Sequence, residues 1–283
     1  MMKNFHKYIT SHKAKHIIIA SLIIIMIAWI ICSNLSIKIS EYKIRDEKIP
    51  SSFDGFVIAQ ISDLHNAEFG RDNSVLIDKL NASNPDIIVF TGDTVDNFHT
   101  DIESALIFIE QAIKIAPCYY VTGNHEAWIG RVEFSELENK MISLGVVVLH
   151  GEGVLLEKED EIISLMGIDD RDYSYGFSKK LPELVNREHF TILLSHRPEY
   201  FDEYVSCGYD LVLSGHAHGG QFRFPFIGGI LAPNQGWFPK YDSGAFTKEN
   251  TTMIVSRGLG NSIVPIRINN PPELILIELN SKG

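Results

Sequence analysis

An uninterrupted apolar run dominates the N-terminal part of the chain. Residues 17–32 read IIIASLIIIMIAWIIC, and no Asp, Glu, Lys or Arg lies between Lys15 and Lys38. At about 1.5 Å per residue, a helix over this charge-free stretch spans about 33 Å, enough to cross a hydrocarbon core of about 30 Å. We therefore expect a basic tail at residues 1–16 and a transmembrane anchor at residues 17–37.

Two other interpretations of this run are a cleaved signal peptide and a buried helix of a soluble protein. No A-x-A-like site follows it and no twin arginine precedes it, which disfavours a signal peptide. Uniform apolarity over this length is unusual for a soluble helix, so we expect a retained single-pass anchor. The apolar run has as many basic residues before it as after it, so the positive-inside rule does not decide its orientation. Because a short basic tail usually stays in the cytoplasm, we expect the following domain outside it.

Beyond Pro50, short apolar runs alternate with stretches of helical spacing. The runs predict strands at Phe56–Ser62, Asp86–Thr91, Cys118–Thr122, Ile162–Gly167, Phe190–Ser195 and Tyr209–Ser214. The stretches between them predict helices at Ser74–Leu80, Ile102–Ile115, Val132–Leu144 and Pro198–Val205. This alternation is typical of an α/β domain whose strands are covered on both faces. Thr251–Ser256 and Glu273–Leu279 are predicted to be added strands that close a second sheet. We expect a linker at residues 38–52 and one domain at residues 53–283.

The composition of the 283-residue chain is that of a globular protein, with 45% hydrophobic and 22% charged residues. Residues 1–48 carry eight basic and three acidic residues, a net charge of +5. Because the whole chain has a net charge of −11, residues 49–283 carry a net charge of −16. An acidic domain repels a phosphate backbone, and we expect no nucleic-acid partner. The three cysteines lack C-x-x-C spacing, which excludes zinc ribbons and disulfide frameworks. Cys118 and Cys207 either pair with each other or remain buried thiols.

Residues of metal-ligating type follow five of the predicted strands. These strand ends are Asp63-Leu64-His65, Gly92-Asp93, Gly123-Asn124-His125-Glu126, His196 and Gly215-His216-Ala217-His218. In open α/β sheets, ligands bind just beyond the carboxyl ends of strands, so we expect these side chains to meet at one rim. Five of the eight histidines after residue 37 lie at these five places. Surface solvation does not explain such clustering.

The ligand types indicate which metals fit. Carboxylate, imidazole and amide ligands without a thiolate suit Mn²⁺, Fe or Zn²⁺. Seven ligands are too many for one tetrahedral ion but suit two ions that share a carboxylate. Two metals about 3.5–4 Å apart can activate a bridging hydroxide and clamp phosphoryl oxygens. We therefore expect two divalent metal ions, with identity open among Mn, Fe and Zn, and a phosphate-ester substrate.

The ordered set D-x-H, G-D, G-N-H-E, a lone His and G-H-x-H resembles the calcineurin-like metallophosphoesterase superfamily. These motifs run from Asp63 to His218. Three later pieces are similar to a bacterial, membrane-associated phosphodiesterase branch of that superfamily: His218-Gly-Gly-Gln221, Ser256-Arg-Gly-Leu-Gly260 and Pro271-Pro-Glu273. The resemblance implies a four-layer α-β-β-α sandwich, which agrees with the α/β pattern. In this chain we expect the sandwich to come after the N-terminal transmembrane helix.

The resemblance also implies a role for each matched residue. The first metal would be bound by Asp63, His65 and His218, the second by Asn124, His196 and His216, and both by the bridging Asp93. His125 would be the acid that protonates the leaving oxygen. Asp96, three residues after the bridging aspartate, would hold the imidazolium of His125, although it could instead cap the helix that follows.

Other segments allow more than one interpretation. Arg223 and Arg257 are candidates to bind a phosphate oxygen. The aromatic, Gly- and Pro-rich residues 221–241 either wall the substrate pocket, touch the bilayer surface or pack on themselves as a loop. Each metal-ligand motif, taken singly, could be a turn or a cap. The remaining histidines match no motif and are interpreted as ordinary surface or core residues: His99, His150 and His189.

The sequence thus predicts a membrane-anchored, dinuclear-metal phosphoesterase that cleaves a phosphodiester or pyrophosphate bond through a metal-bridging hydroxide. A lipid-linked substrate is one candidate, because the anchor confines the site near the membrane and the resembled branch includes lipid-precursor hydrolases. Two alternatives stay open: a phosphomonoesterase or protein phosphatase with the same centre, and a non-catalytic, metal-dependent binding module. A nuclease is disfavoured by the acidic domain.

Overall fold

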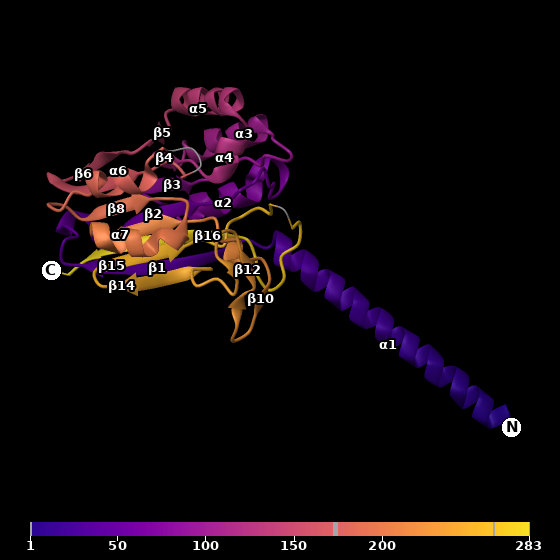
Figure 1. Ribbon diagram of the computed structural model, residues 1–283. Coiled ribbons are helices and arrows are strands. Elements are labelled where there is room, and N and C mark those ends of the chain that lie inside the picture. Colours follow the sequence, from indigo (N-terminus) through magenta and orange to yellow (C-terminus); the bar gives the residue numbers. More distant parts are fainter. Residues whose placement is uncertain (1, 172–174, 263, 283) are drawn as a thin grey trace.

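Two six-stranded β-sheets face each other in the centre of the domain, and helices cover their outer faces (Figure 1). The computed structural model describes residues 2–171, 175–262 and 264–282. The layers follow the order α-β-β-α, which confirms the sandwich predicted from the sequence. One long N-terminal helix extends away from the domain.

The first sheet has the strand order β1-β16-β2-β3-β4-β5. Its strands are β1 (Lys38–Asp46), β2 (Phe56–Ile61), β3 (Ile87–Thr91), β4 (Cys118–Val121), β5 (Val147–Val148) and β16 (Glu273–Ser281). Strands β2 to β5 run parallel. Three helices join them: α2 (Ser74–Ala82), α3 (Ile102–Ala112) and α5 (Arg131–Leu144). Parallel strands need such crossovers, which bring the carboxyl ends of β2, β3 and β4 to the same edge.

The second sheet has the order β14-β15-β9-β8-β7-β6. Its strands are β6 (Glu152–Lys158), β7 (Glu161–Gly167), β8 (Thr191–Leu194), β9 (Leu211–Ser214), β14 (Gly244–Lys248) and β15 (Thr251–Val255). Helices α6 (Phe177–Leu184) and α7 (Phe201–Cys207) pack on its outer face. The short helix α4 (Asn124–Trp128) follows β4 directly. Between β9 and β14 lie two small hairpins: β10 (Arg223–Phe224) with β11 (Gly228–Gly229), and β12 (Leu231–Ala232) with β13 (Gly236–Trp237).

Three hydrophobic clusters fill the spaces between the four layers. The first lies between the first sheet and its helices, where Phe90 of β3 meets Phe108 of α3 edge to face. The second lies between the sheets and includes Val89 and Leu194. The third joins the second sheet to α6 and α7 and includes Tyr204. Neighbouring residues such as Val89 and Phe90 enter different clusters because successive strand residues point to opposite faces. The sheets thus form a rigid support for the residues at their ends.

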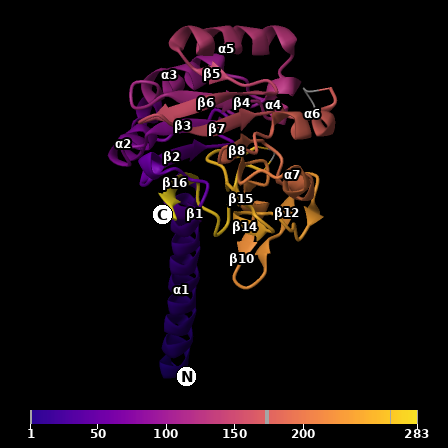
Figure 2. The ribbon, with the colours of Figure 1, turned by 90° about the vertical axis from the view of Figure 1, so that its left-hand side faces the viewer.

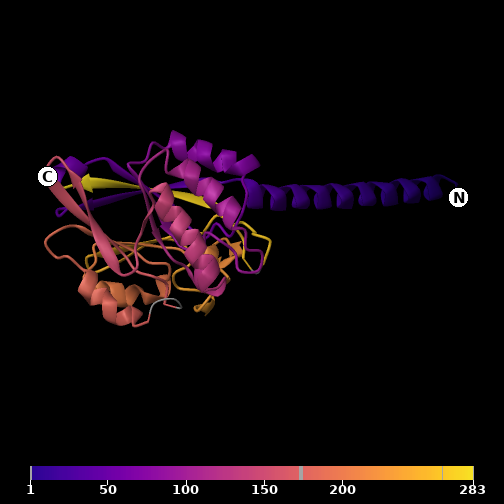
Figure 3. The same cartoon turned by 90° about the horizontal axis from the view of Figure 1, so that it is seen from above.

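The N-terminal helix α1 (Met2–Leu35) contains an apolar stretch, Lys15–Leu35, that is long enough to cross a membrane. Its apolar side chains are largely exposed, and the helix leaves the domain as a straight rod (Figures 1 and 3). Residues 38–46 form strand β1, where a linker was expected at residues 38–52. The whole of β1 pairs with β16, and Ile49 is buried between the sheets. Only a few residues therefore separate the anchor helix from the sheet.

The C-terminal strand lies in the first sheet, whereas the sequence predicted it in the second. β16 is inserted between β1, to which it is parallel, and β2, to which it is antiparallel. Ile275 and Ile277 face the space between the sheets, and Leu274 faces the helices. A strand buried on both faces carries no alternation that would tell which sheet it joins. Only β15 extends the second sheet as expected.

The largest differences between observed and predicted helix boundaries occur at two places. α3 ends at Ala112 and does not continue to Ile115, just before Pro117. The predicted helix Pro198–Val205 is a 3₁₀ turn at Pro198–Tyr200 followed by α7. Strands β5, β6 and β14 were not predicted. They lie at sheet edges and are partly exposed, so their apolar patterns are weak.

Candidate active site and metal centre

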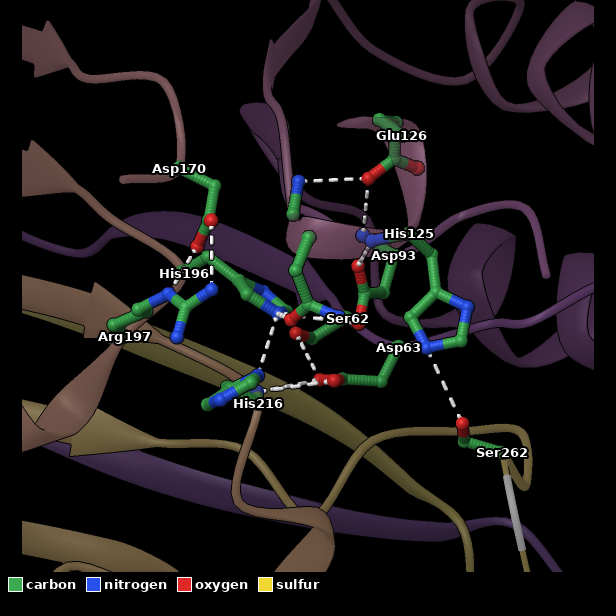
Figure 4. A network of polar contacts seen from close by, with 12 residues as sticks. Ser62, Asp63, Asp93, His125, Glu126, Asp170, His196, Arg197, His216 and Ser262 are labelled. Atoms are coloured by element: carbon green, nitrogen blue, oxygen red, sulfur yellow. Dashed lines mark hydrogen bonds and ion pairs between the residues drawn. The ribbon is translucent and has the colours of Figure 1, made fainter. Parts of the chain in front are cut away.

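The five polar strand ends lie at one edge of the sandwich, where their side chains converge between the two sheets (Figure 4). β2, β3 and β4 contribute from the first sheet, and β8 and β9 from the second. All seven predicted metal ligands are buried there: Asp63, His65, Asp93, Asn124, His196, His216 and His218. Burial of so many polar groups is unfavourable unless they are paired or bind a metal.

Backbone conformation also marks this edge. Five of the seven predicted ligands have left-handed backbone angles, with φ between 47° and 65°: Asp63, His65, Asp93, His216 and His218. Each such residue costs about 1–3 kcal/mol, and residues of this kind cluster at active sites.

The first group of ligands is formed by residues after β2, β3 and β9. The Nε2 atoms of His65 and His218 are 3.1 Å apart. His218 Nε2 lies 3.4 Å from Asp63 Oδ1, and His65 Nε2 lies 3.7 Å from Asp93 Oδ2. One ligand atom from each of the four residues falls within 4.8 Å of the others. Four ligand atoms therefore surround one small volume.

The second group shares Asp93 with the first. His196 Nε2 lies 3.2 Å from Asp93 Oδ2, and His216 Nδ1 lies 3.1 Å from the same nitrogen. The side-chain oxygen of Asn124 approaches His196 Nε2 to 3.3 Å. The aspartate, the two imidazoles and the amide thus define a second small volume beside the first. Asp93 belongs to both groups, which is the position that a ligand shared by two ions would have.

The donor set fits two divalent metal ions. Each group supplies imidazole nitrogens and a carboxylate, and the second adds an amide oxygen, a set that suits Mn, Fe or Zn. Asp63 Oδ2 accepts a hydrogen bond from Ser62 Oγ at 2.5 Å, and the carboxylate also accepts one from the backbone N–H of His216. His196 Nδ1 faces the backbone oxygen of Thr91 at 2.7 Å, so that Nε2 is the nitrogen left for a metal.

Glu126, the last residue of the G-N-H-E motif, was not among the predicted site residues. Its buried carboxylate accepts hydrogen bonds from the backbone N–H groups of Gly123 (2.7 Å), Asp93 (2.9 Å) and Thr94 (2.9 Å). These bonds tie the loop after β3 to the loop after β4 and so position Asp93 and Asn124. The place of a carboxylate in the first turn of a helix was the signal that could have identified it.

Two glycines are required by close approach to the ligands. A Cβ at Gly123 would lie 2.1 Å from Asp93 Oδ1, and one at Gly215 would lie 2.3 Å from Asp63 Oδ2. Contacts this short exclude any side chain. The glycines that precede Asn124 and His216 therefore let the two aspartates lie against neighbouring backbone.

The pKa values of the candidate ligands shift in both directions. Burial would lower the pKa of His196, but the charge and hydrogen bond of Asp93 raise it to about 10. Burial raises the pKa of Asp63. Burial would also raise the pKa of Asp93, but the charge and hydrogen bond of His196 hold it well below its usual range. Burial lowers the pKa values of His216 and His218 well below the ordinary one. Asp93 is therefore ionised at neutral pH, and these two imidazoles are neutral bases.

His125 lies in helix α4 beside the first ligand group. Its Nδ1 accepts a hydrogen bond from the backbone N–H of Asn97 at 3.1 Å, and its Nε2 lies 3.2 Å from Ser262 Oγ. Burial lowers the pKa of His125 to about 4, so the ring is neutral near pH 7. Because Nδ1 is the acceptor, the ring proton resides on Nε2. His125 can therefore donate a hydrogen bond from Nε2.

Asp96 contacts two of the histidines. Its Oδ2 is 3.5 Å from Nδ1 of His125 and 3.5 Å from Nδ1 of His65. Burial would raise the pKa of Asp96, but hydrogen bonds from His65 and from the backbone two and three residues later lower it to about 2. The next helix is capped by Asp101, not by Asp96. Asp96 is thus a permanent anion shared between a candidate ligand and the candidate acid.

A cavity of about 430 Å³ opens beside the ligand groups. Polar lining residues include Asp93, Asn124, His125, His216 and His218. Apolar lining residues include Trp128, Leu231, Ala232, Pro233 and Val264. A substrate here would have one end among the metal ligands and another against apolar side chains.

The arginines of the cavity are not the predicted ones. Arg223 donates to Asp242 at 2.8 Å, Arg257 lies 3.6 Å from a carboxylate oxygen of Glu273, and neither lines the cavity in the part of the chain that the structure describes. The cavity is lined instead by Arg171 and Arg197. Sequence reasoning passed over both because no motif marks them, although Arg197 directly follows a predicted ligand.

Arg197 is held rigidly. Its Nε and Nη2 donate to the two oxygens of Asp170 at 2.6 and 2.9 Å, and both side chains are buried (Figure 4). Such a two-point ion pair orients the planar guanidinium beside the second ligand group.

Residues 221–241 wall the cavity, in agreement with one of the predicted alternatives. They contribute Leu231, Ala232, Pro233 and Asn234 to its lining. Asn234 Nδ2 lies 3.2 Å from His216 Nε2, so this segment also contacts a predicted ligand. The segment folds into the hairpins β10–β11 and β12–β13, which a pattern rich in Gly and Pro did not reveal.

Comparison with known proteins identifies the family. The sequence profile described as calcineurin-like phosphoesterase matches residues 56–220, which include all seven candidate ligands. The chain belongs to the calcineurin-like phosphoesterase family. The phosphoesterase is 33% identical over 258 residues to the metallophosphoesterase YkuE of Bacillus subtilis (strain 168), covering 87% of this chain and 86% of that protein.

One further relative and one solved structure are also similar to this chain. A transmembrane protein with metallophosphoesterase domain from Danio rerio is 30% identical, over 86% of this chain and 57% of its own length. The crystal structure of TT1561 from Thermus thermophilus aligns with a TM-score of 0.49 at 12% identity, over 72% of this chain and 90% of that chain.

The family assignment confirms the resemblance drawn from the motifs and the expected cofactor, two divalent metal ions. The phosphoesterase is a metal-dependent hydrolase of phosphate esters. The apolar stretch of α1 and the relatives named as transmembrane proteins fit a membrane protein. Cys118 and Cys207 are both buried and free.

Proposed function

We propose that this phosphoesterase hydrolyses a phosphodiester or pyrophosphate bond in a membrane-anchored substrate, and that the organic part of this substrate is apolar. The observation that carries the proposal is the pairing of two metal-ligand groups, joined by Asp93, with a cavity whose lining also includes large apolar side chains. A phosphoryl group fits the first part and a lipid-like substituent fits the second.

The residues of the site have the following proposed roles. Asp63, His65, Asp93 and His218 would hold one divalent ion, and Asp93, Asn124, His196 and His216 the other. When bound, these ions would supply positive charge for the phosphoryl oxygens and lower the pKa of a water. His125 would donate a hydrogen bond from Nε2–H to the leaving oxygen. Arg197, oriented by Asp170, would bind a further anionic oxygen.

The proposed topology is a single membrane span with the catalytic domain outside the cytoplasm. It is supported by the exposed apolar stretch Lys15–Leu35 and by the short basic tail that precedes it. Reporter fusions at the C-terminus, one active only outside and one only inside the cytoplasm, test this orientation. Activity of the inside reporter alone would overturn it.

Turnover measurements test the reaction class. With Mn²⁺, we expect faster hydrolysis of bis(p-nitrophenyl) phosphate than of p-nitrophenyl phosphate, because the apolar side of the cavity accommodates a second substituent. Asp93→Asn serves as the inactive control and Asp78→Asn, a carboxylate on α2 away from the cavity, as the matched active control. Preference for the monoester would favour the phosphomonoesterase alternative. A metal-loaded protein inactive on both esters and on a pyrophosphate diester would favour a binding module.

A further inference from the structure

The hairpin β10–β11 and its neighbours carry large apolar side chains that the domain does not cover. The exposed residues are Phe224, Phe226, Ile227, Trp237, Phe238 and Ile266. They come from two segments, residues 221–241 and 257–272, which contain no Asp or Glu although residues 49–283 as a whole have a net charge of −16. An apolar surface formed by segments without an acidic residue, on an otherwise acidic domain, calls for a partner.

This apolar surface is placed on the side of the domain from which α1 leaves. In Figures 1 and 2 the β10–β11 hairpin lies near the end of α1 that joins the domain; in Figure 2 both point down, and in Figure 1 the hairpin points down while α1 runs down and to the right. If α1 crosses a bilayer, the surface of that bilayer lies next to the end of α1 and therefore next to the hairpin.

Hydrogen bonds fix the end of α1 to this surface. The side-chain amide of Asn34 accepts from the backbone N–H of Arg267 at 2.8 Å and donates to the backbone oxygen of the same residue at 3.1 Å. Arg267 is itself fully buried, and its guanidinium donates to the backbone oxygen of Arg257 at 2.8 Å. The last turn of α1 is thus bonded to residues 257–272.

The same segment is bonded to the hairpin. Gln221 Nε2 donates to the backbone oxygens of Val264 and Ile266 at 2.7 and 2.9 Å, and Phe222 forms a β-bridge with Ile268. Asp242, which lies outside the hairpin, accepts hydrogen bonds from Arg223 and from the backbone N–H of Gly229, the latter at 2.6 Å. Successive short contacts therefore connect the end of α1 to the hairpin. These contacts fix the position of the hairpin relative to the end of α1, measured along the axis of that helix.

We propose that this apolar surface inserts into the headgroup and acyl boundary of the bilayer in which α1 is anchored. Aromatic residues are well suited to that boundary, and absence of acidic residues avoids repulsion from anionic headgroups. The inference deepens the proposed function and rests on it. Leu231 and Val264 line the cavity and are also partly exposed, and they belong to the same two segments as the apolar surface, so a lipid-linked phosphate ester would reach the cavity from the membrane side.

Spin labels on the full-length protein in vesicles of phosphatidylcholine and phosphatidylglycerol test the depth of the surface. Labels at Phe226→Cys and Ile227→Cys are placed in a Cys32→Ser background, in which the remaining cysteines, Cys118 and Cys207, are buried. Leu155→Cys on β6, a similarly exposed apolar residue at the opposite end of the domain, is the matched control. We expect labels at 226 and 227 to lie about 5–10 Å below the phosphates, accessible to oxygen and shielded from an aqueous nickel chelate.

The native Cys32, exposed on α1, separates this proposal from the proposed anchor. A Cys32 label deep in the bilayer together with labels at 226 and 227 as water-accessible as the one at 155 would overturn the docking and leave the anchor intact. A water-accessible Cys32 label would overturn both. If spin labels at residues 226 and 227 are shielded from both oxygen and the nickel chelate, the surface is covered by a protein partner, such as a second copy of the chain. This result would also overturn insertion of the surface into the membrane.

Discussion

Two clusters in this phosphoesterase bring histidines and carboxylates together, and they use the ring nitrogens differently. At His150, Nδ1 is 2.9 Å from Asp169, and Nε2 contacts Glu138 on the other side of the ring. At the strand ends, ring nitrogens face each other, as with the 3.1 Å between His65 Nε2 and His218 Nε2.

The difference teaches how to distinguish a structural cluster from a binding site. The His150 cluster is complete, because each ring nitrogen has its own carboxylate acceptor. In the strand-end cluster, the ligand atoms of several residues share one small volume, an arrangement that a bound cation stabilises. Convergence of lone pairs, more than the count of histidines, indicates function.

The largest effect should come from the ligand that both groups share. Asp93→Asn removes a charge from both metal positions, and we expect activity to fall to background and metal content to drop below two ions per chain. The loss of activity should exceed the roughly 10- to 100-fold loss that is typical when a residue that only orients a metal ligand is replaced. Elemental analysis and turnover measure the two effects, with Asp78→Asn as control. Full metal content in Asp93→Asn would contradict its bridging place.

His125→Ala should separate proton donation from metal binding. We expect a rate loss of about 10²–10⁴-fold, the usual range for a lost proton donor, with metal content unchanged. The rate should recover most for an ester with a good leaving group, such as p-nitrophenol, because that oxygen needs little protonation. Loss of metal in this variant would assign His125 to the ligands instead.

Arg197→Lys should lower substrate affinity while preserving charge. A lysine cannot make the two-point contact with Asp170, so its ammonium would not be oriented toward the cavity. We expect KM to rise roughly 10- to 100-fold, the usual worth of a charged hydrogen bond. Arg223→Lys is the matched control, since Arg223 pairs with Asp242 outside the cavity lining. Equal effects of the two substitutions would remove Arg197 from the site.

Acid should act on the strand-end cluster by displacing metal. Imidazole must be unprotonated to ligate, so protons compete with the ions, and affinity should weaken about tenfold per pH unit for each proton displaced. Metal titrations between neutral pH and mild acid measure the slope. An affinity independent of pH would contradict imidazole ligation.

The smallest effect should come from the His150 cluster, with the opposite pH dependence. Hydrogen bonding to Asp169 raises the pKa of His150 from 6.5 to about 9. Its stabilisation is therefore complete below about pH 6.5 and is lost as pH rises through about 9. We expect His150→Gln to cost on the order of 1 kcal/mol at pH 6, allowing for partial exposure of the ring, and little at pH 10. Thermal unfolding at both pH values measures this, and an equal cost at both would contradict the charged pair.

Sequence reasoning singled out the candidate ligands that the fold brings together, because strand ends and motif spacing are local properties. One residue, polar or glycine, separates Asp63 and Asp93 from the apolar run before each of them. Parallel strands bring their carboxyl ends to the same edge of a sheet. Sequence reasoning missed Arg197 and chose Arg223, because the partner of an arginine depends on side chains from other strands. The same applies to Glu126, whose three backbone partners lie in two different loops.

The chain's amino-acid order by itself determined the apolar stretch, the alternating strands and helices of an α/β domain and the identity of the candidate metal-ligating side chains. Each of these follows from periodicity or from residue chemistry within a short window. Only the tertiary structure decided that β16 joins the first sheet, that residues 38–46 are a strand and that an apolar surface flanks the end of α1. Those features depend on which distant segments pack together, and burial on both faces of a strand leaves no local pattern to report it.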